Sequence, residues 1–401
     1  MKSHVSKVSI GELTDFIKNG LSVQQTRVVN GLPITRIETI ANGVIDKTHV
    51  GYAGIKNGEK DDWLLKRGDI LISHINSKSH LGKCAIYEGE PKQLIHGMNL
   101  LNMRLDQRKA YPRFVYHVLR SPQFIRTIAK ITKDSVNQSS FNITSFKELK
   151  IPLLQLEEQK RIAAIMDKAD AIHRKRQKAI KLADDFIRAT FLDMIGSKYE
   201  TRTIDELINE NIITYHKDGN HGGSYPRANE FGNEGIPFIS ARCFVEKGFI
   251  DDTKVPRLKT EKANKLKIGW IEKGDVLLAH NATVGPVFLY EGQYQKALIG
   301  TSLTAYRPNI EMMTSPYLFG ALKSNYFQQQ LIKLMKQSTR NQVPITAQKN
   351  LKIYYPPFEL QKQYTAVAEK YYLLLRKSDE EQDLGEELFN SLTQRAFRGE
   401  L

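Results

Sequence analysis

Cysteine is nearly absent from this 401-residue sequence, and long apolar runs are absent altogether. The two cysteines, Cys84 and Cys243, are too few for a disulfide framework and lack the paired spacing of a zinc site. No run of 18 apolar residues occurs, and the first residues, MKSHVSKVSIGEL, are too polar for a signal peptide. These absences predict a soluble, cytoplasmic protein with no membrane segment.

The sequence also lacks the motifs that most often mark an enzyme. It contains no G-x-x-x-x-G-K-[ST] loop, no G-x-G-x-x-G turn, no H-E-x-x-H pair and no G-x-S-x-G elbow. The acidic pairs Asp61–Asp62 and Asp251–Asp252 leave a metal-dependent nuclease open, because that chemistry needs clustered carboxylates. Such pairs also arise by chance in a chain with 26% charged residues. The pattern favours a binding protein without catalytic residues, metal or cofactor.

What the sequence does contain is an internal duplication. KRGDILISHI at 66–75 returns as EKGDVLLAHN at 272–281, and LPITRIE at 32–38 resembles IPFISAR at 236–242. Further short matches keep the same order along the chain at an offset that drifts only between 202 and 206. A collinear series of this kind indicates a tandem duplication with diverged copies. In both copies, the Gly-Asp pair reads as a turn that begins a buried strand.

Each copy consists of a mixed segment followed by a long helix. Short apolar runs such as 70–72 and 276–278 read as strands, and prolines at 152 and 356–357 suit the approach to a helix. We expect an α+β fold of two similar globular domains, each followed by a long helix. The expected boundaries are 1–154 for the first domain, 155–196 for its helix, 197–356 for the second domain and 357–401 for its helix.

The two helices carry apolar residues at alternating spacings of three and four. The first seam includes Ile162, Ile165, Ala169, Ile172 and Phe186, and the second includes Tyr364, Val367, Tyr371 and Leu374. A repeat of 3.5 residues over several heptads predicts a two-helix coiled coil. An ion pair between Arg176 and Glu381 in the polar middle of the seams would require antiparallel helices. The alternative is that each helix packs only on its own domain.

The positive charge is concentrated in the globular segments. The formal net charge is +15, of which 1–154 carries +10 and 197–356 carries +6, whereas the two helices together carry −1. Two basic domains joined by near-neutral helices are typical of a protein that holds a polyanion at two places. A basic protein without a nucleic-acid partner is also common.

Two motifs identify a family that the chain resembles. The copies share LKIPLLQLEEQ at 149–159 and LKIYYPPFELQ at 351–361, and the chain ends LTQRAFRGEL at 392–401. With the repeated Gly-Asp segment, these motifs resemble the specificity (S) subunit of type I restriction-modification systems over nearly the whole chain. The second copy departs slightly, since Leu360 stands where the first has Glu158.

The resemblance implies a DNA-binding subunit without catalysis of its own. Each globular segment would be a target recognition domain that reads one half of a split double-stranded DNA site. The helices would pair as an antiparallel coiled coil, set the spacing of the half-sites and dock two DNA adenine methyltransferase (M) subunits. A motor-nuclease (R) subunit can join such complexes. The alternative is a non-catalytic coiled-coil scaffold with basic globular ends, which explains the helices but not the location of the charge.

Candidate DNA contacts follow from the chemistry of the base edges. Arg and Lys read guanine, Asn and Gln read adenine, and most basic side chains touch only phosphate. The candidates in the first domain are Arg36, His74, Asn76, Lys78, Lys83 and Gln138, and those in the second are Arg242, His280, Asn281, Arg340 and Gln342. His74 and His280 stand where relatives often have Arg, and each could instead be a structural histidine. The polar loops KDSVNQSSFN and KQSTRNQVPI could equally be solvated connectors.

Overall fold

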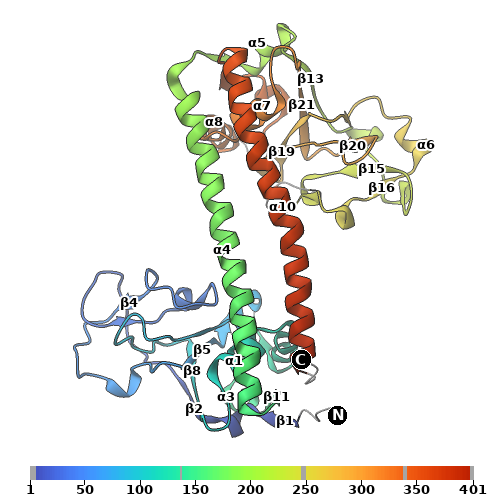
Figure 1. Ribbon diagram of the computed structural model, residues 1–401. Helices are drawn as coiled ribbons and strands as arrows, with labels where there is room; N and C mark the ends of the chain where they lie inside the picture. The colour runs from blue at the N-terminus through green and yellow to red at the C-terminus, as the bar shows by residue number, and fades with distance from the viewer. Residues whose placement is uncertain (1–5, 136–137, 245–249, 337–340, 398–401) are drawn as a thin grey trace. The chain divides into compact units, whose positions relative to one another are not determined.

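The computed structural model describes residues 6–135, 138–244, 250–336 and 341–397, with the side chains of the last helix described up to residue 377 and at 391 and 395. The chain divides into two compact units. Unit 1 comprises Met1–Lys175 and Glu381–Leu401, and unit 2 comprises Arg176–Glu380. Each unit therefore contains the globular part of one repeat (Figure 1).

Unit 1 is built on a four-stranded antiparallel sheet in the order β2-β8-β5-β7. Its strands are β2 (Thr14–Asn19), β5 (Ile70–Ser73), β7 (Cys84–Ile86) and β8 (Leu100–Leu105). Three helices follow in the sequence, α1 (Pro112–Arg120), α2 (Pro122–Ile131) and α3 (Ile143–Glu148). The smaller pairings involve β1 (Ser6–Ser9) with β11 (Lys150–Leu153), β3 (Pro33–Ile34) with β4 (Gly51–Tyr52), and β10 (Ser139–Ser140) with both β6 (Ile75–Asn76) and β9 (Lys133–Asp134).

Unit 2 repeats this plan with a sheet in the order β13-β21-β18-β19. Its strands are β13 (Ile213–Asp218), β18 (Val276–Asn281), β19 (Thr283–Leu289) and β21 (Leu303–Pro308). Around it lie β12 (Thr201–Thr203) paired with β22 (Lys352–Tyr354), and the helices α5 (Ile204–Asn209), α6 (Thr260–Ala263), α7 (Ser315–Lys323), α8 (Asn325–Lys336) and α9 (Ile345–Gln348). A second sheet of five short strands comprises β14 (Phe231–Gly232), β15 (Ile236–Ile239), β16 (Arg257–Leu258), β17 (Trp270–Ile271) and β20 (Ala297–Ile299).

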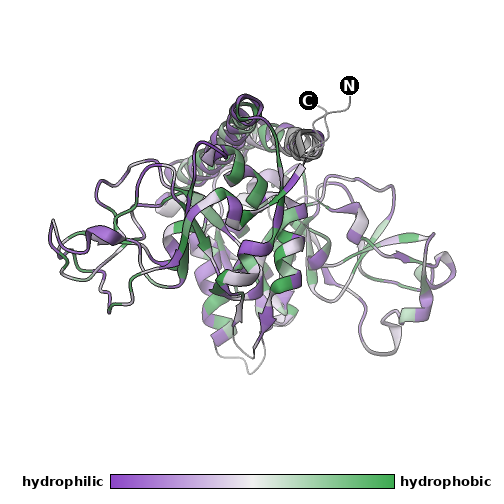
Figure 2. Cartoon of the chain, turned by 90° about the horizontal axis from the view of Figure 1, so that it is seen from below, coloured by the Kyte–Doolittle hydropathy of each residue, from purple (hydrophilic) through white to green (hydrophobic). Residues whose placement is uncertain are grey.

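The central strand of each unit is buried on both faces, which explains its continuous apolar sequence. Ile70 and Ile72 of β5 point into the core that α1 covers, whereas Leu71 joins a separate cluster on the opposite face. In unit 2, Val276 and Leu277 of β18 divide in the same way. Because alternate side chains of a strand point to opposite faces, both faces must be apolar when both are covered. The helices show bands of hydrophobic and hydrophilic residues, as amphipathic helices require (Figure 2).

The two long helices form where the sequence predicts them. Helix α4 spans Leu156–Met194, and α10 spans Phe358–Phe397. Within unit 2 they pack antiparallel, because Phe191 lies edge-on to Tyr364 with ring centroids 5.3 Å apart, while the earlier Asp184 accepts a hydrogen bond from the hydroxyl of the later Tyr371. The antiparallel pairing is therefore confirmed in this unit. The side chain of Glu381, the predicted partner of Arg176, lies outside the described residues.

The predicted seam is wrong in part. Phe186 and Leu374 are 61% and 48% exposed, whereas their neighbours Ile187 and Leu375 are buried. A straight α-helix has 3.6 residues per turn, so its buried face drifts by about 20° per heptad from a strict 3.5-residue repeat. The buried face has therefore moved by one position within unit 2, whereas Ile162, at the start of the predicted seam, is buried in the core of its own unit.

A glutamine shared by the two copies ties each long helix to its globular part. The side chain of Gln159 in α4 accepts a hydrogen bond from the Tyr111 backbone N–H (2.8 Å) and donates to the carbonyls of Lys109 (3.2 Å) and Leu154 (2.8 Å). Gln361 in α10 accepts from the Thr314 N–H (3.3 Å) and donates to the carbonyl of Pro356. Both amides are fully buried, so the motif satisfies backbone groups at the start of α1 and α7.

Candidate DNA-contacting surfaces

The repeated Gly-Asp pair forms a buried anchor at the start of the central strand. Gly68 has φ +95° and Gly274 φ +94°, a conformation that favours glycine. The carboxylate of Asp69 accepts two hydrogen bonds from Arg104, at 2.7 and 2.6 Å, and Asp275 accepts two from Arg307, at 2.7 and 2.8 Å. The predicted structural role of the Gly-Asp turn is therefore confirmed. The anchor fixes the strand whose opposite end carries the candidate contacts.

The two histidines at that opposite end are buried. His74 is 7% exposed and His280 is 1% exposed. The His74 ring hydrogen-bonds the backbone of Asn99, and Nδ1 of His280 donates to the carbonyl of Val343 at 3.0 Å. Burial lowers the pKa of both imidazoles below the usual 6.5, so both are neutral at pH 7. Both rings are buried as placed, and one nitrogen of each, Nδ1 of His74 and Nε2 of His280, has no hydrogen-bond partner among the described residues.

Just beyond His74, the structure brings three of the candidates together. Asn76 in β6 lies opposite Ser139 of β10, which directly follows the exposed Gln138. Lys78, also exposed, forms an ion pair with Asp134 of β9 at 2.7 Å. The described parts of this loop, 133–135 and 138–140, are therefore not a free connector, because β10 pairs with both β9 and β6.

Unit 2 also brings an Asn after the central strand to a polar loop that contains Gln. Asn281 at the end of β18 forms an antiparallel bridge with Gln342, and the N–H of Ala282 donates to the carbonyl of Asn341 at 2.9 Å. Ala282 has φ +65°, which is uncommon for a residue other than glycine. Arg340, the remaining candidate in this loop, lies outside the described residues.

The other candidates lie beside these clusters. Lys83 is half-buried, and its carbonyl accepts the N–H of Ser73 at the end of β5. Arg36 pairs with Glu38 at 3.1 Å and lines a depression of about 390 Å³ that Asn99, the partner of His74, also lines. Arg242 is exposed in a short 3₁₀ turn, Ala241–Cys243, which follows β15.

Sequence reasoning missed a second set of surface residues in unit 1. A depression of about 280 Å³ next to Arg36 is also lined by Arg27, Lys47, His49 and the exposed Val29. The available signal was the pair Val28–Val29 within the otherwise polar loop SVQQTRVVNG. Two adjacent β-branched residues in such a loop are either a strand or an exposed apolar tip, and only the structure distinguishes these.

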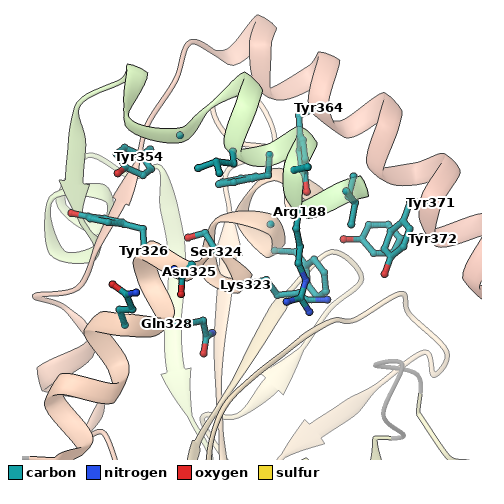
Figure 3. Close-up of a pocket in the computed structure, with 18 residues that line it drawn as sticks. Arg188, Lys323, Ser324, Asn325, Tyr326, Gln328, Tyr354, Tyr364, Tyr371 and Tyr372 are labelled. Carbon is teal, nitrogen blue, oxygen red and sulfur yellow. The ribbon is translucent and has the colours of Figure 1, made fainter. Parts of the chain in front are cut away.

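Unit 2 contains a larger cavity between α4, α7, α8 and α10 (Figure 3). Its volume is about 670 Å³, and its lining includes Tyr364, Tyr371, Tyr372, Arg188 and Lys323. Burial lowers the pKa of the Lys323 ammonium, while the nearby Asp184 carboxylate partly restores it. Asp184 also pairs with Arg188 at 3.5 Å. The cavity is thus an aromatic space with two cations and one carboxylate at its edge.

The part of the chain that the structure describes contains no group of three or more His, Cys, Asp or Glu side chains able to hold a metal ion. Asp251 instead accepts hydrogen bonds from Thr253 and pairs with Lys254, and Asp252 accepts one from the Tyr294 hydroxyl. Among the described helices, none combines the length and apolar character needed to cross a membrane.

A model of the type I restriction modification DNA specificity domain matches the chain twice, over residues 2–182 and 196–381. The chain belongs to this family. It is 34% identical over 369 residues to a Methanocaldococcus jannaschii protein described as the MjaX type I restriction enzyme specificity subunit, which covers 88% of this chain and 83% of that protein. It is also 21% identical over 215 residues to the EcoKI specificity subunit of Escherichia coli, covering 51% of this chain and 46% of the relative.

The fold agrees with this family. The type I restriction-modification S subunit of M. genitalium superposes with a TM-score of 0.61 at 19% identity, covering 99% of this chain and 97% of that one. Family membership confirms the prediction of a specificity subunit, and with it the interpretation as a non-catalytic DNA-specificity protein. The coiled-coil scaffold is not favoured.

Proposed function

We propose that each unit of this specificity subunit reads one half of a bipartite double-stranded DNA site. The observation that supports this proposal is that a polar loop pairs with the chain just beyond the central strand in both units: Asn76 pairs with Ser139, next to Gln138, in unit 1, and Asn281 bridges Gln342 in unit 2. Asn and Gln amides can pair with two atoms of an adenine edge in the major groove. The repeat alignment places Asn281 opposite Ile75, so the Asn side chain is shifted by one position between the copies, and the two units can read different half-sites.

The basic candidates bind the phosphates of the DNA backbone and contact the remaining bases. In unit 1 these contacts come from Arg36, Lys78 and Lys83, and in unit 2 they come from Arg242 and Arg340. The charge of +10 on 1–154 and +6 on 197–356 supports phosphate binding, which predicts a steep loss of affinity with salt. His74 and His280 act by fixing the strand ends from inside the domains.

The recognition domains in this proposal are 1–154 and 197–356, and the spacer helices are 155–196 and 357–401. Half-sites read from one face of the duplex lie about 34 Å apart, one helical turn, centre to centre. The length of α4 and α10 supports a role in setting this separation. Deleting about seven residues, one heptad, from each helix, between 165 and 190 in α4, should change the spacer of the DNA site and leave both half-site sequences unchanged.

The paired helices also dock two adenine methyltransferase subunits, to which a motor-nuclease subunit can be added. Leu182 and Phe186 of α4 and Leu373 of α10 are exposed apolar side chains, which supports a protein partner at this place. Replacing Leu182 and Phe186 together with Glu should abolish co-elution with the methyltransferase subunit in gel filtration. The matched control is Ile310→Glu in unit 2, because Ile310 is an exposed apolar residue outside the long helices.

The proposal is tested by mapping DNA methylation. This chain is co-expressed with its methyltransferase subunit in a host that lacks adenine methylation, and modified adenines are sequenced. We expect a split motif that appears only when this chain is present. A stable complex that leaves the DNA unmodified, or methylation of an unsplit motif, would contradict the proposal.

A further inference from the structure

Unit 1 displays an apolar tip beside its candidate DNA contacts. Val28 and Val29 are 75% and 76% exposed, and the side chain of the preceding Arg27 is 77% exposed. Single exposed apolar residues are ordinary on protein surfaces. Two adjacent β-branched residues next to an exposed arginine are a different case, because this combination offers an apolar contact and a phosphate contact within one short segment.

The tip is held in place by the rest of unit 1. Thr26, just before it, exchanges both backbone hydrogen bonds with Tyr52 of β4, at 2.9 and 3.0 Å. On the other side, the carbonyl of Asn30 accepts the N–H of Gly54 at 3.1 Å. Gly31 has φ +76°, and a Cβ there would lie 2.3 Å from the carbonyl oxygen of Ile55. The loop therefore presents the valines on a fixed base, which reduces the entropy lost when they bind.

The surroundings of the tip suit a polyanion. Val29 shares its depression of about 280 Å³ with Arg27, Arg36 and Lys47, three cations against the single carboxylate of Glu38. Glu38 lies 3.7 Å from Arg27 and 3.1 Å from Arg36, and its single negative charge leaves two of the three positive charges in excess. Two valines without such cations would suit a protein partner, whereas this set suits a base edge flanked by phosphates.

Unit 2 lacks an equivalent tip. Its corresponding segment, 219–235, contains no Val, Ile, Leu or Thr, and its exposed aromatic residue Tyr225 packs edge-on against Phe238 with ring centroids 6.4 Å apart. The apolar tip is thus present in unit 1 and absent from the corresponding segment of unit 2. This is expected for a residue pair that determines DNA specificity rather than the fold of the unit.

Resting on the proposed function, we infer that Val28 and Val29 contact the C5-methyl group of thymine in the half-site that unit 1 reads. The major groove presents this methyl group at every A·T pair, and apolar side chains are the groups that recognise it. Arg27 and Arg36 hold the neighbouring phosphates. Unit 1 then distinguishes T from C through a methyl contact in addition to the amide contacts at Asn76 and Gln138.

The test removes the methyl group from the DNA and the apolar group from the protein. The assembled complex with its methyltransferase subunits is titrated with duplexes in which each thymine of the mapped site is replaced in turn by uracil. Uracil keeps the hydrogen-bonding edge of thymine and lacks only the methyl group. We expect about a fourfold loss of affinity at one or two positions of a single half-site, the effect of one buried methyl group.

The protein variant is Val28→Ser with Val29→Ser, which removes the methyl groups of both exposed side chains and should not disturb folding. It should bind the natural duplex about as weakly as the wild type binds the uracil duplex, and it should show no further uracil effect. Ile310→Ser, at an equally exposed apolar residue in unit 2, is the control and should retain the uracil effect in full.

Three results would overturn the inference. They are a uracil effect that persists in the valine variant, equal affinity for thymine and uracil at every position with unchanged binding by that variant, or the same equal affinity with weaker binding by that variant. The last would assign the valines to a wedge between base pairs. In each case the split methylation motif would still be present, whereas failure of the proposed function would remove the motif itself.

Discussion

The two units attach their long helix to the globular part with different chemistry. In unit 1, α1 meets α4 through ions, with Arg113 at 3.0 Å and His117 at 2.8 Å from Asp167, and Arg120 paired with Asp170. In unit 2, α7 meets α10 through aromatic rings.

The aromatic joint differs from the ionic one at some of the aligned positions. Phe319 lies edge-on to Tyr372 at 5.4 Å, and Gly320 lets Tyr364 approach so closely that a Cβ would lie 2.6 Å from its hydroxyl. The repeat offset aligns Arg120 with Lys323 and Asp170 with Tyr372. The same joint thus tolerates either chemistry, and the cavity of unit 2 lies where unit 1 has its ion pairs.

Removing the buried Asp–Arg pair should lower the stability of both units. Replacing Asp69 with Ala leaves Arg104 without its buried partner, which costs about 3 kcal/mol of the free energy of unfolding. Asp275→Ala should cost somewhat less, because Arg307 keeps Glu272 at 3.0 Å. Urea denaturation of each variant measures this loss. A loss in one unit only would show that the two Gly-Asp turns are not equivalent.

The units should also share a loss of stability in acid. Burial lowers the pKa of His96 in unit 1 and His216 in unit 2 to about 4. Because both values lie below the unfolded value near 6.5, the stabilisation is complete above pH 6.5 and is lost as the pH falls towards 4. At pH 5, the depressed pKa of each histidine should lower the free energy of unfolding by about 2 kcal/mol relative to pH 7.

The pH dependence can be assigned to these side chains. His96→Gln and His216→Gln should each flatten the dependence of the unfolding free energy on pH between 6.5 and 4, even if stability at pH 8 falls. An unchanged slope in both variants would assign the acid sensitivity to other groups.

The contrast between the two joints can be measured directly. Asp170→Ala removes the carboxylate that pairs with the guanidinium of Arg120 and should destabilise the protein by about 1.5 kcal/mol. At the aligned position in unit 2, Tyr372→Phe keeps the ring contact with Phe319 and should cost less than about 0.5 kcal/mol. Equal losses in thermal denaturation would remove the distinction drawn between the ionic and aromatic joints.

The smallest effect concerns the turn beside the unit 2 contacts. Ala282→Gly relieves a left-handed backbone and should stabilise the protein by about 0.5 kcal/mol. Gly285→Ala in the same hairpin, where φ is +114°, is the opposite control and should destabilise it. If both changes shifted the melting temperature in the same direction, backbone strain would not be the cause.

The sequence alone predicts features that follow local rules. The duplication, the long helices and the Gly-Asp turn with its buried strand all follow from spacing and residue type, and each agrees with the structure. The buried face of α4 does not follow, because the drift between a 3.5- and a 3.6-residue period is decided by packing and moves the contact from Phe186 to Ile187.

Features that depend on contacts between distant segments of the chain could not be predicted from the sequence. The burial of His280 depends on a hydrogen bond to Val343, 63 residues later in the chain. The second sheet of unit 2 includes the parallel pair β15 and β20, which are separated by a long stretch of sequence. Likewise, the exposure of Val28 depends on the contact of its loop with Tyr52.

The central claim, that each unit reads its own half-site, is tested most directly by domain-specific variants in the methylation map. One variant carries Asn76→Ala with Gln138→Ala, and the other carries Asn281→Ala with Gln342→Ala. We predict that each relaxes the sequence of one half of the motif, a different half in each case, while the other half and the spacer stay unchanged. If both variants relaxed the same half, or if both halves changed together, the division of reading between the two units would be contradicted.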